Sequence, residues 1–195
     1  MTIYTKQHLK EAVEILENID SSKVDAMIEM LVELKRTKGR LFILGVGGSA
    51  ANASHAVNDF RKLAGIETYA PTDNVAELSA RTNDEGWETV FDSYLKVSNL
   101  NSKDCILILS VGGGDQDRRI SLNLCKAIDL AISVDAKILG IVGKENGYTH
   151  RKANLCLVIP AVNPQNITPH SESFQAVVWH LMVSHPALKE NPTKW

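Results

Sequence analysis

His55 and Asp59, four residues apart in the first third of the chain, have side chains that bind metals and transfer protons. In a helix, residues at this spacing project from one face, about one turn from each other. The pair therefore fits a shared metal ion or a proton relay. A surface ion pair is the alternative interpretation of the same spacing, and the pair by itself does not decide between the two.

Glu172 and His180 form a second pair near the end of the chain. They lie in a segment that begins with Thr168 and Pro169, residues typical of a helix start. Over the eight helical residues between them, the side chains come to lie about 80° apart around the axis and about 12 Å apart along it. One ion reaches both only if it lies between them. His180 stands among apolar residues, so a buried structural histidine is the alternative interpretation.

Two glycine-rich turns are candidates for phosphate binding. Residues 45–50 (GVGGSA) follow one apolar run and open a helical pattern, and residues 110–114 (SVGGG) follow another apolar run. Such turns present backbone N–H groups, and the positive end of a following helix, to an anion. Two turns of this kind indicate one phosphate ester bound between them, whereas a dinucleotide fold relies on the first turn. A tight strand-to-helix connection is the alternative for the first turn.

Short apolar runs alternate with helical patterns from Arg40 onward. We predict β-strands at residues 41–44, 67–70, 105–109, 137–142 and 155–159, and helices at residues 50–63, 75–82, 87–97, 122–134 and 169–184. Parallel strands need helical crossovers of this kind. The predicted fold class is therefore α/β, a three-layer doubly wound sheet of five parallel strands. Ligands bind at the carboxyl ends of the strands in such folds, where both glycine turns lie.

Two amphipathic helical patterns at residues 1–38 precede this region. They predict a helical hairpin that extends a single domain spanning residues 1–195, with the α/β core at residues 39–195. The apolar faces of these helices need a partner surface, which is either the domain itself or another subunit. The second alternative predicts a homo-oligomer.

The composition is that of an ordinary globular protein and disfavours several functions. Of the 195 residues, 44% are hydrophobic and 23% charged, and 21 Lys and Arg nearly balance 23 Asp and Glu, for a net charge of −2. This balance disfavours partners such as nucleic acid or an anionic membrane. The sequence has no leader pattern and no apolar run of membrane-spanning length, and its three cysteines are far apart among apolar neighbours. We expect a cytoplasmic protein with reduced, buried thiols.

The ordered set of motifs resembles the SIS-domain sugar isomerases, and more narrowly the phosphoheptose (sedoheptulose 7-phosphate) isomerases. The resemblance covers nearly the whole chain. The motifs that carry it are the 45–49 turn followed by His55 and Asp59, residues 82–86 (TNDEG), Ser110 and Ser121, residues 143–147 (GKENG), and Glu172 with His180. It implies a flavodoxin-like SIS fold, a small phosphorylated sugar as ligand, and a homotetramer to which the N-terminal helices contribute.

The resemblance also implies roles for individual residues. A zinc ion, one per subunit, is expected on His55, Asp59, Glu172 and His180. Asp59 stands where the family has Glu, and Glu172 where it has Gln, so the charge of the site differs from the family pattern. The residues expected to bind the substrate are Gly47, Gly48, Ser49, Asn83, Asp84, Ser110, Val111, Gly112 and Ser121.

The phosphate loop departs from the family pattern as well. Val111 and Gly112 replace hydroxyl residues, and residues 113–120 resemble an insertion. Arg118 and Arg119 in this insertion can replace the lost hydroxyl groups by charge.

The resemblance implies an aldose–ketose isomerase that converts sedoheptulose 7-phosphate to D-glycero-D-manno-heptose 7-phosphate through an enediolate. Asp59 or Glu172 would be the base, His180 the acid or proton shuttle, and zinc the electrophile. The alternative is a non-catalytic SIS module that binds a sugar phosphate or a protein partner. Because about 12 Å separates Glu172 from His180, we expect active sites between subunits, with Asp59 and His180 acting from different chains.

Overall fold

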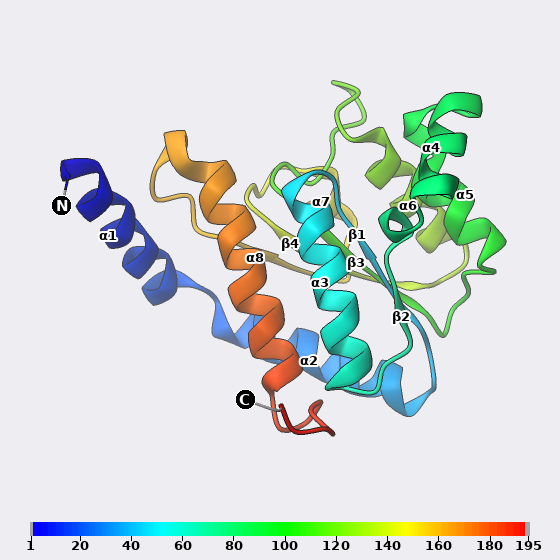
Figure 1. Cartoon of the computed structure of the whole chain (residues 1–195), viewed down its shortest axis with the longest axis horizontal. Helices are drawn as coiled ribbons and strands as arrows, with labels where there is room; N and C mark the ends of the chain where they lie inside the picture. The colour runs from blue at the N-terminus through cyan, green and yellow to red at the C-terminus, as the bar shows by residue number, and fades with distance from the viewer. Residues whose placement is uncertain (1, 194–195) are drawn as a thin grey trace.

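A five-stranded parallel β-sheet forms the centre of the protein (Figure 1). The computed structural model describes residues 2–193. The strands are β1 (Leu41–Leu44), β2 (Thr68–Tyr69), β3 (Cys105–Ser110), β4 (Lys137–Val142) and β5 (Leu155–Val158). They lie in the order β2-β1-β3-β4-β5, and every neighbouring pair is parallel. Each strand lies where an apolar run predicted it, so the predicted fold class is confirmed.

Helices cover both faces of the sheet. They are α1 (Ile3–Asn18), α2 (Ser21–Arg36), α3 (Gly48–Lys62), α4 (Val75–Asp84), α5 (Val90–Val97), α6 (Leu122–Ser133), α7 (Tyr148–Lys152) and α8 (Ile167–Ser184), with short 3₁₀ helices η1 (Pro71–Asp73), η2 (Trp87–Thr89) and η3 (Pro164–Asn166). Within residues 2–193, none of these helices has the length and apolar character that crossing a membrane requires.

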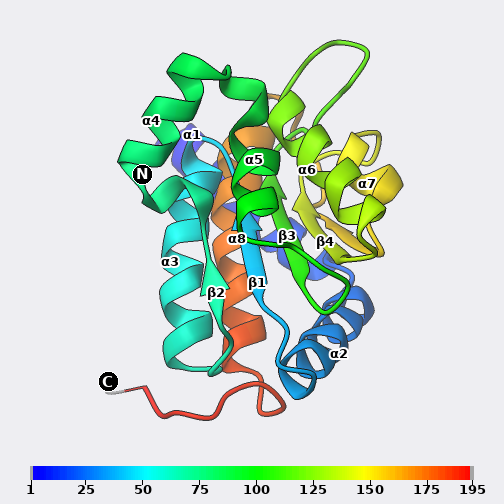
Figure 2. The same cartoon turned by 90° about the vertical axis from the view of Figure 1, so that its right-hand side faces the viewer.

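Helices lie on both sides of the sheet (Figure 2). Alternating side chains along the strands build one core on each face. Leu41 and Ile43 of β1 point to the face covered by α2, α3 and α8. Phe42 and Leu44 point to the opposite face, where α5, α6 and α7 pack. A strand buried on both sides explains why these runs are continuously apolar rather than alternating.

The chain reverses its winding direction between β1 and β3. From β1 it runs to β2 at one edge of the sheet, and from β3 it continues to β4 and β5 at the other. The turn that begins at Gly45 follows β1, and Ser110 is the last residue of β3. The two glycine-rich turns therefore flank the crevice where doubly wound folds bind their ligands.

The two N-terminal helices do not form the predicted hairpin. The apolar face of α2 is buried in the core, with Met27 and Leu31 fully covered, so α2 belongs to the domain rather than to an extension. In contrast, α1 lies beside the start of α8 and leads away from α2 (Figure 1). Leu9, Val13 and Leu16 of α1 remain 55%, 52% and 56% exposed. Of these two helices, it is α1 that keeps an apolar face not covered by residues 2–193.

Glu11 fastens α1 to the start of α8. Its buried carboxylate accepts hydrogen bonds from Asn163 (2.6 Å), Asn166 (2.8 Å) and His170 (2.8 Å), as well as from Gln7 (2.9 Å). These bonds, that from Asn166 above all, lower the pKa of Glu11 to about 2. Because the Asn166 side chain is bonded to Glu11, it does not cap α8. Helix η3 continues directly into α8, which begins at Ile167 rather than at the predicted Pro169.

The predicted insertion after β3 is a small closed hairpin. Asp115 and Ile120 exchange two backbone hydrogen bonds of 2.9 Å each. At the base of the hairpin, a β-carbon placed on Gly114 would lie 3.5 Å from the backbone oxygen of Ser121. The inserted segment is therefore residues 115–120, whose two ends lie close together in the loop. It is shorter than the predicted insertion of residues 113–120.

Candidate active site

Helices α3 and α8 pack side by side and run in the same direction. Near their starts, the Asn52 amide donates to the backbone oxygen of Glu172 (2.8 Å) and to Oε1 of the buried Gln175 (3.1 Å). Further along both helices, Asp59 meets His180. The two helices therefore meet at two separate levels, one with Asn52 and Glu172 and the other with Asp59 and His180.

The lower level is a cluster of His55, Asp59 and His180. Oδ2 of Asp59 lies 3.9 Å from Nε2 of His55 and 3.8 Å from Nε2 of His180. One ligand atom from each residue can be chosen so that all three lie within 4.8 Å of one another. The three side chains line a hollow of about 320 Å³ that opens to the surface. All three belong to one chain, so the prediction that Asp59 and His180 act from different chains is wrong.

The chemistry of this cluster fits a metal ion. Nδ1 of His180 lies 2.8 Å from the backbone oxygen of Ala176, which only accepts hydrogen bonds, so Nδ1 carries the proton. In the neutral ring, Nε2 therefore directs its lone pair at the Asp59 carboxylate. A cation between the two groups would remove the repulsion between the Nε2 lone pair and the carboxylate. In addition, a histidine that donates its other N–H to a carbonyl is typical of metal ligands. Two imidazoles and one carboxylate match the three-ligand sets of catalytic zinc sites.

Glu172 lies outside this cluster. Its carboxylate sits against Gly48, the first residue of α3, where an added β-carbon would lie 2.5 Å from Oε2 and 2.7 Å from Oε1. The four residues predicted to hold one zinc ion therefore divide into a cluster of three and a single acid. Seven helical residues separate Gly48 from His55, about 10 Å along the axis.

The glycine turn provides backbone donors at the same level as Glu172. Gly47 has φ 63°, a left-handed conformation that glycine adopts without strain, and α3 has no side-chain cap at this end. The first backbone N–H groups of α3 therefore remain available to an anion. Ser49 is buried, with 2% of its surface exposed.

The loop after β3 is fixed by its own hydrogen bonds. Oγ of the buried Ser110 accepts from the Gly113 N–H at 3.0 Å, so this hydroxyl already supports the loop that contains Val111 and Gly112. Ser121 precedes α6 with φ 49°, and its hydroxyl makes no capping bond to a backbone N–H. The Ser121 hydroxyl is therefore free to bind a ligand.

Asn83 and Asp84 are exposed at the end of α4. The Asn83 amide donates to Asp84 at 2.7 Å. Within residues 2–193, no hydrogen bond or ion pair joins either residue to another predicted site residue. Their proposed contact with the sugar therefore stays a prediction.

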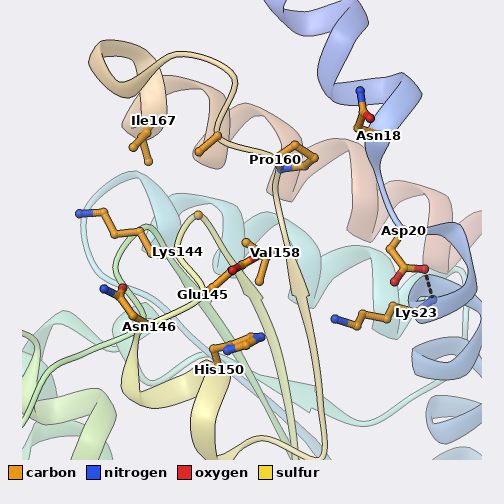
Figure 3. A pocket seen from close by; sticks show the side chains of 12 residues that line it. Asn18, Asp20, Lys23, Lys144, Glu145, Asn146, His150, Val158, Pro160 and Ile167 are labelled. Carbon is orange, nitrogen blue, oxygen red and sulfur yellow. Dashed lines mark hydrogen bonds between the residues drawn. The ribbon is translucent and has the colours of Figure 1, made fainter.

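A larger cavity lies elsewhere on the same edge of the sheet. It measures about 720 Å³ and lies at the carboxyl ends of β4 and β5, beside the start of α2 (Figure 3). Asp20 and Lys23 stand on one side of it, and Lys144 and Asn146 on the other. No residue of the predicted site lines it.

His8, Glu11 and His170 form a second group of residues that could bind a metal. One ligand atom from each lies within 4.8 Å of the other two. Its carboxylate is already fully engaged as the anchor of α1. The His8 and His170 rings are stacked, with centroids 4.4 Å apart, and Nε2 of His170 is already bonded to Glu11 at 2.8 Å. We therefore interpret this group as structural.

Sequence reasoning missed Asn52 and Gln175. Asn52 lies on the predicted helix that starts at the glycine turn, and Gln175 on the last helix, but neither lies within a recognisable motif. Their contact depends on how α3 packs against α8. The one available signal is that two amide residues occupy otherwise apolar helix faces.

Comparison with known proteins identifies the family of the chain. The SIS domain family model matches residues 6–142. Phosphoheptose isomerase 1 of Campylobacter jejuni is 31% identical over 163 residues, which cover 80% of each chain. The structure of phosphoheptose isomerase from Neisseria gonorrhoeae superimposes with a TM-score of 0.80 at 19% identity, over 92% of this chain and 96% of that one.

The chain belongs to the SIS-domain family of α/β proteins. Within that family, it falls in the group of the phosphoheptose isomerases. The fold alone is also shared with proteins of another kind. The Vibrio vulnificus NanR protein, solved in complex with ManNAc-6P, superimposes with a TM-score of 0.64 at 12% identity, over 92% of this chain and 59% of that one.

Proposed function

We propose that this chain is an aldose–ketose isomerase that converts sedoheptulose 7-phosphate to D-glycero-D-manno-heptose 7-phosphate through an enediolate. The observation that carries the proposal is the parallel packing of α3 and α8. It places one acid, Glu172, at the glycine turn and a metal-type cluster on the same two helices. The name of the Campylobacter jejuni relative supports the choice of substrate.

We assign the base to Glu172. Conversion of a ketose to an aldose moves a proton from C1 to C2 and needs a base within hydrogen-bond reach of both carbons. The Glu172 carboxylate lies beside the N–H groups at the start of α3, which also suit a developing oxyanion. Asn52 holds the backbone of Glu172, and so limits its movement relative to the turn.

We assign His55, Asp59 and His180 to a zinc ion. Zinc bound there would supply an electrophile that polarises the sugar carbonyl and stabilises the enediolate. Because Nδ1 of His180 is bonded to Ala176, Nε2 is the one nitrogen through which His180 acts, either as ligand or as acid. These three residues would hold the ion and would leave it accessible to the sugar oxygens.

The distance between Glu172 and the cluster supports a site completed by a second subunit. Two groups about 10 Å apart along a helix cannot both act on adjacent carbons of one sugar. The His55 and His180 side chains are 58% and 48% exposed, and Val177 and Leu181 beside His180 are 44% and 48% exposed. We propose a homotetramer in which the cluster of one subunit faces the glycine turn of another, with the apolar face of α1 in the contact.

A sugar-phosphate-binding module without catalysis is the second candidate. The sharing of the fold with the NanR protein, which was solved with a sugar phosphate bound, favours it. Such a module needs the glycine turns but neither Glu172 nor the cluster.

The two candidates are distinguished by incubating purified protein with sedoheptulose 7-phosphate, with and without a metal chelator. An isomerase produces an aldose signal in the NMR spectrum, and the chelator abolishes it. A binding module gives saturable binding of the sugar phosphate in calorimetry and no aldose.

A further inference from the structure

Residues 188–193, which follow the last helix, pass beneath the ends of α8 and α3 (Figure 2). We call this segment the strap. Its first residue, Leu188, is 1% exposed and belongs to the core on the side of α2, α3 and α8. Lys35, near the end of α2, donates from Nζ to the backbone oxygen of Leu188 at 3.1 Å and lies 2.8 Å from Oε1 of Glu190. The start of the strap is therefore fixed to the core and to α2.

The strap supplies hydrogen bonds to the end of α3. The last carbonyl groups of a helix have no partner within the helix. The backbone oxygen of Leu63, where α3 ends, accepts from the N–H groups of Glu190 at 2.8 Å and Asn191 at 3.1 Å. The backbone oxygen of Lys62 accepts from the Asn191 side-chain amide at 2.9 Å. The strap therefore fixes the last turn of α3.

This last turn carries Asp59 of the candidate metal cluster. The backbone oxygen of Asp59 accepts from the Leu63 N–H at 2.8 Å. In the Asp59 side chain, Oδ1 accepts from Asn58 at 2.8 Å, and Oδ2 is the oxygen near His55 and His180. A movement of the last turn therefore displaces Oδ2 from the two imidazoles.

The strap also reaches the hollow of about 320 Å³ at the cluster. Thr193 lines this hollow together with the three residues of the cluster. Lys62 and Leu63, whose backbone oxygens bind the strap, line it as well. The strap therefore forms part of one wall of the hollow and holds another part of the wall in place.

Resting on the zinc site of the proposed function, we infer that the strap is a positioning segment of that site, which retains the metal ion by fixing Asp59 and enclosing the hollow. Groups that orient a metal ligand without touching the ion change metal affinity about 10- to 100-fold when they are removed. Residues 188–193 lie outside every motif that carries the family resemblance. The strap is therefore a feature of the metal site that the resemblance does not imply.

The test compares the double variant Glu190→Ala/Asn191→Ala with Lys189→Ala. The double variant removes the ion pair with Lys35 and the side-chain bond to Lys62, but leaves Leu188 in the core. The Lys189 side chain makes no hydrogen bond or ion pair within residues 2–193, so its loss is a matched control in the same segment. Each protein is loaded with zinc, and transfer of the zinc to an excess of a chromogenic chelator gives its rate of release.

We expect zinc to leave the double variant about tenfold faster than wild type, and Lys189→Ala to stay within about twofold of wild type. Hydrogen exchange of residues 59–63 should accelerate in the double variant as well. A strap with a structural role alone would lower the melting temperature of the double variant and leave its rate of zinc release unchanged.

Equal rates of zinc release from wild type and the double variant would overturn the inference, whatever the change in melting temperature. So would equal acceleration by Lys189→Ala, or a wild-type chain that binds no zinc. Failure of the proposed function has another signature. In that case, wild type forms no aldose from sedoheptulose 7-phosphate, while zinc still leaves the double variant faster than wild type.

Discussion

The carboxylate of Glu172 lies so close to the Cα of Gly48 that a β-carbon there would fall 2.5 Å from Oε2. This contact joins the last helix to the glycine turn after β1. It separates Glu172 from the cluster of His55, Asp59 and His180, with which sequence reasoning had grouped it. Glycine at position 48 therefore leaves room for a neighbouring acid, whereas the left-handed backbone of the turn is at Gly47.

Gly48→Ala should displace Glu172 without unfolding the protein. Gly48 lies in α3 and has no positive φ, so the backbone accepts alanine. We expect kcat to fall about 100-fold, since a shift of about 1 Å at a reacting group has an effect of that size. Thermal unfolding should change little. In a Glu172→Ala background, Gly48→Ala should have no further effect on kcat, and an undiminished effect there would contradict this account.

His55→Ala should remove the metal while leaving the fold intact. The His55 side chain is 58% exposed, so its loss removes little core packing. Elemental analysis should show about one zinc ion per chain in wild type and much less in the variant. His185→Ala, which changes a histidine outside the cluster, is the control. Fully active wild-type protein with no bound metal would reject the assignment.

Glu172→Ala and His180→Ala should complement each other when the two chains are mixed. Each variant alone loses activity, but in a mixed tetramer one interface can combine an intact Glu172 with an intact cluster. Asp59→Ala mixed with His180→Ala should restore nothing, because both residues belong to the same cluster. Complementation by the second pair, or an active monomer in light scattering, would contradict the shared site.

The attachment of α1 should weaken in acid. The pKa of Glu11 is about 2 in the folded protein, below its ordinary value of 4.5, mainly because of the hydrogen bonds from Asn166 and His170. A lowered pKa means that the carboxylate stabilises the fold above about pH 4.5 and that this contribution disappears as the pH falls toward 2. Hydrogen exchange of α1 should accelerate over this range.

Two variants on α1 check this assignment. Glu11→Gln should accelerate exchange of α1 already at neutral pH and remove most of its dependence on acid. Glu14→Gln changes an exposed glutamate on the same helix and should behave as wild type. Identical exchange in wild type and Glu11→Gln at all pH values would show that this carboxylate does not hold α1.

The sheet could be predicted from the sequence because each strand is a buried apolar run. The spacing of His55 and Asp59 also placed them correctly on one helix face. The position of Glu172 could not be predicted, because it depends on the packing of α3 against α8. Neither could the partners of Arg118 and Arg119, since adjacent arginines on a hairpin differ only in the surfaces they reach.

Helix ends and the role of the N-terminal region also depended on tertiary contacts. Asn166 precedes α8 but gives its side chain to Glu11, so the usual capping pattern did not apply. Ser121 adopts a left-handed conformation directly after the 115–120 hairpin, and it makes no side-chain capping bond to α6. The apolar pattern of α2 predicted a buried face but not whether the sheet or another subunit covers it.

The central claim is that Glu172 transfers a proton between C1 and C2 of a sugar phosphate. NMR of sedoheptulose 7-phosphate incubated in D₂O with wild-type protein and with Glu172→Gln measures this directly. We predict an aldose product that carries deuterium at C2 with wild type, and neither product nor deuterium exchange with Glu172→Gln, although that variant still binds the substrate. Undiminished conversion by Glu172→Gln would contradict the account.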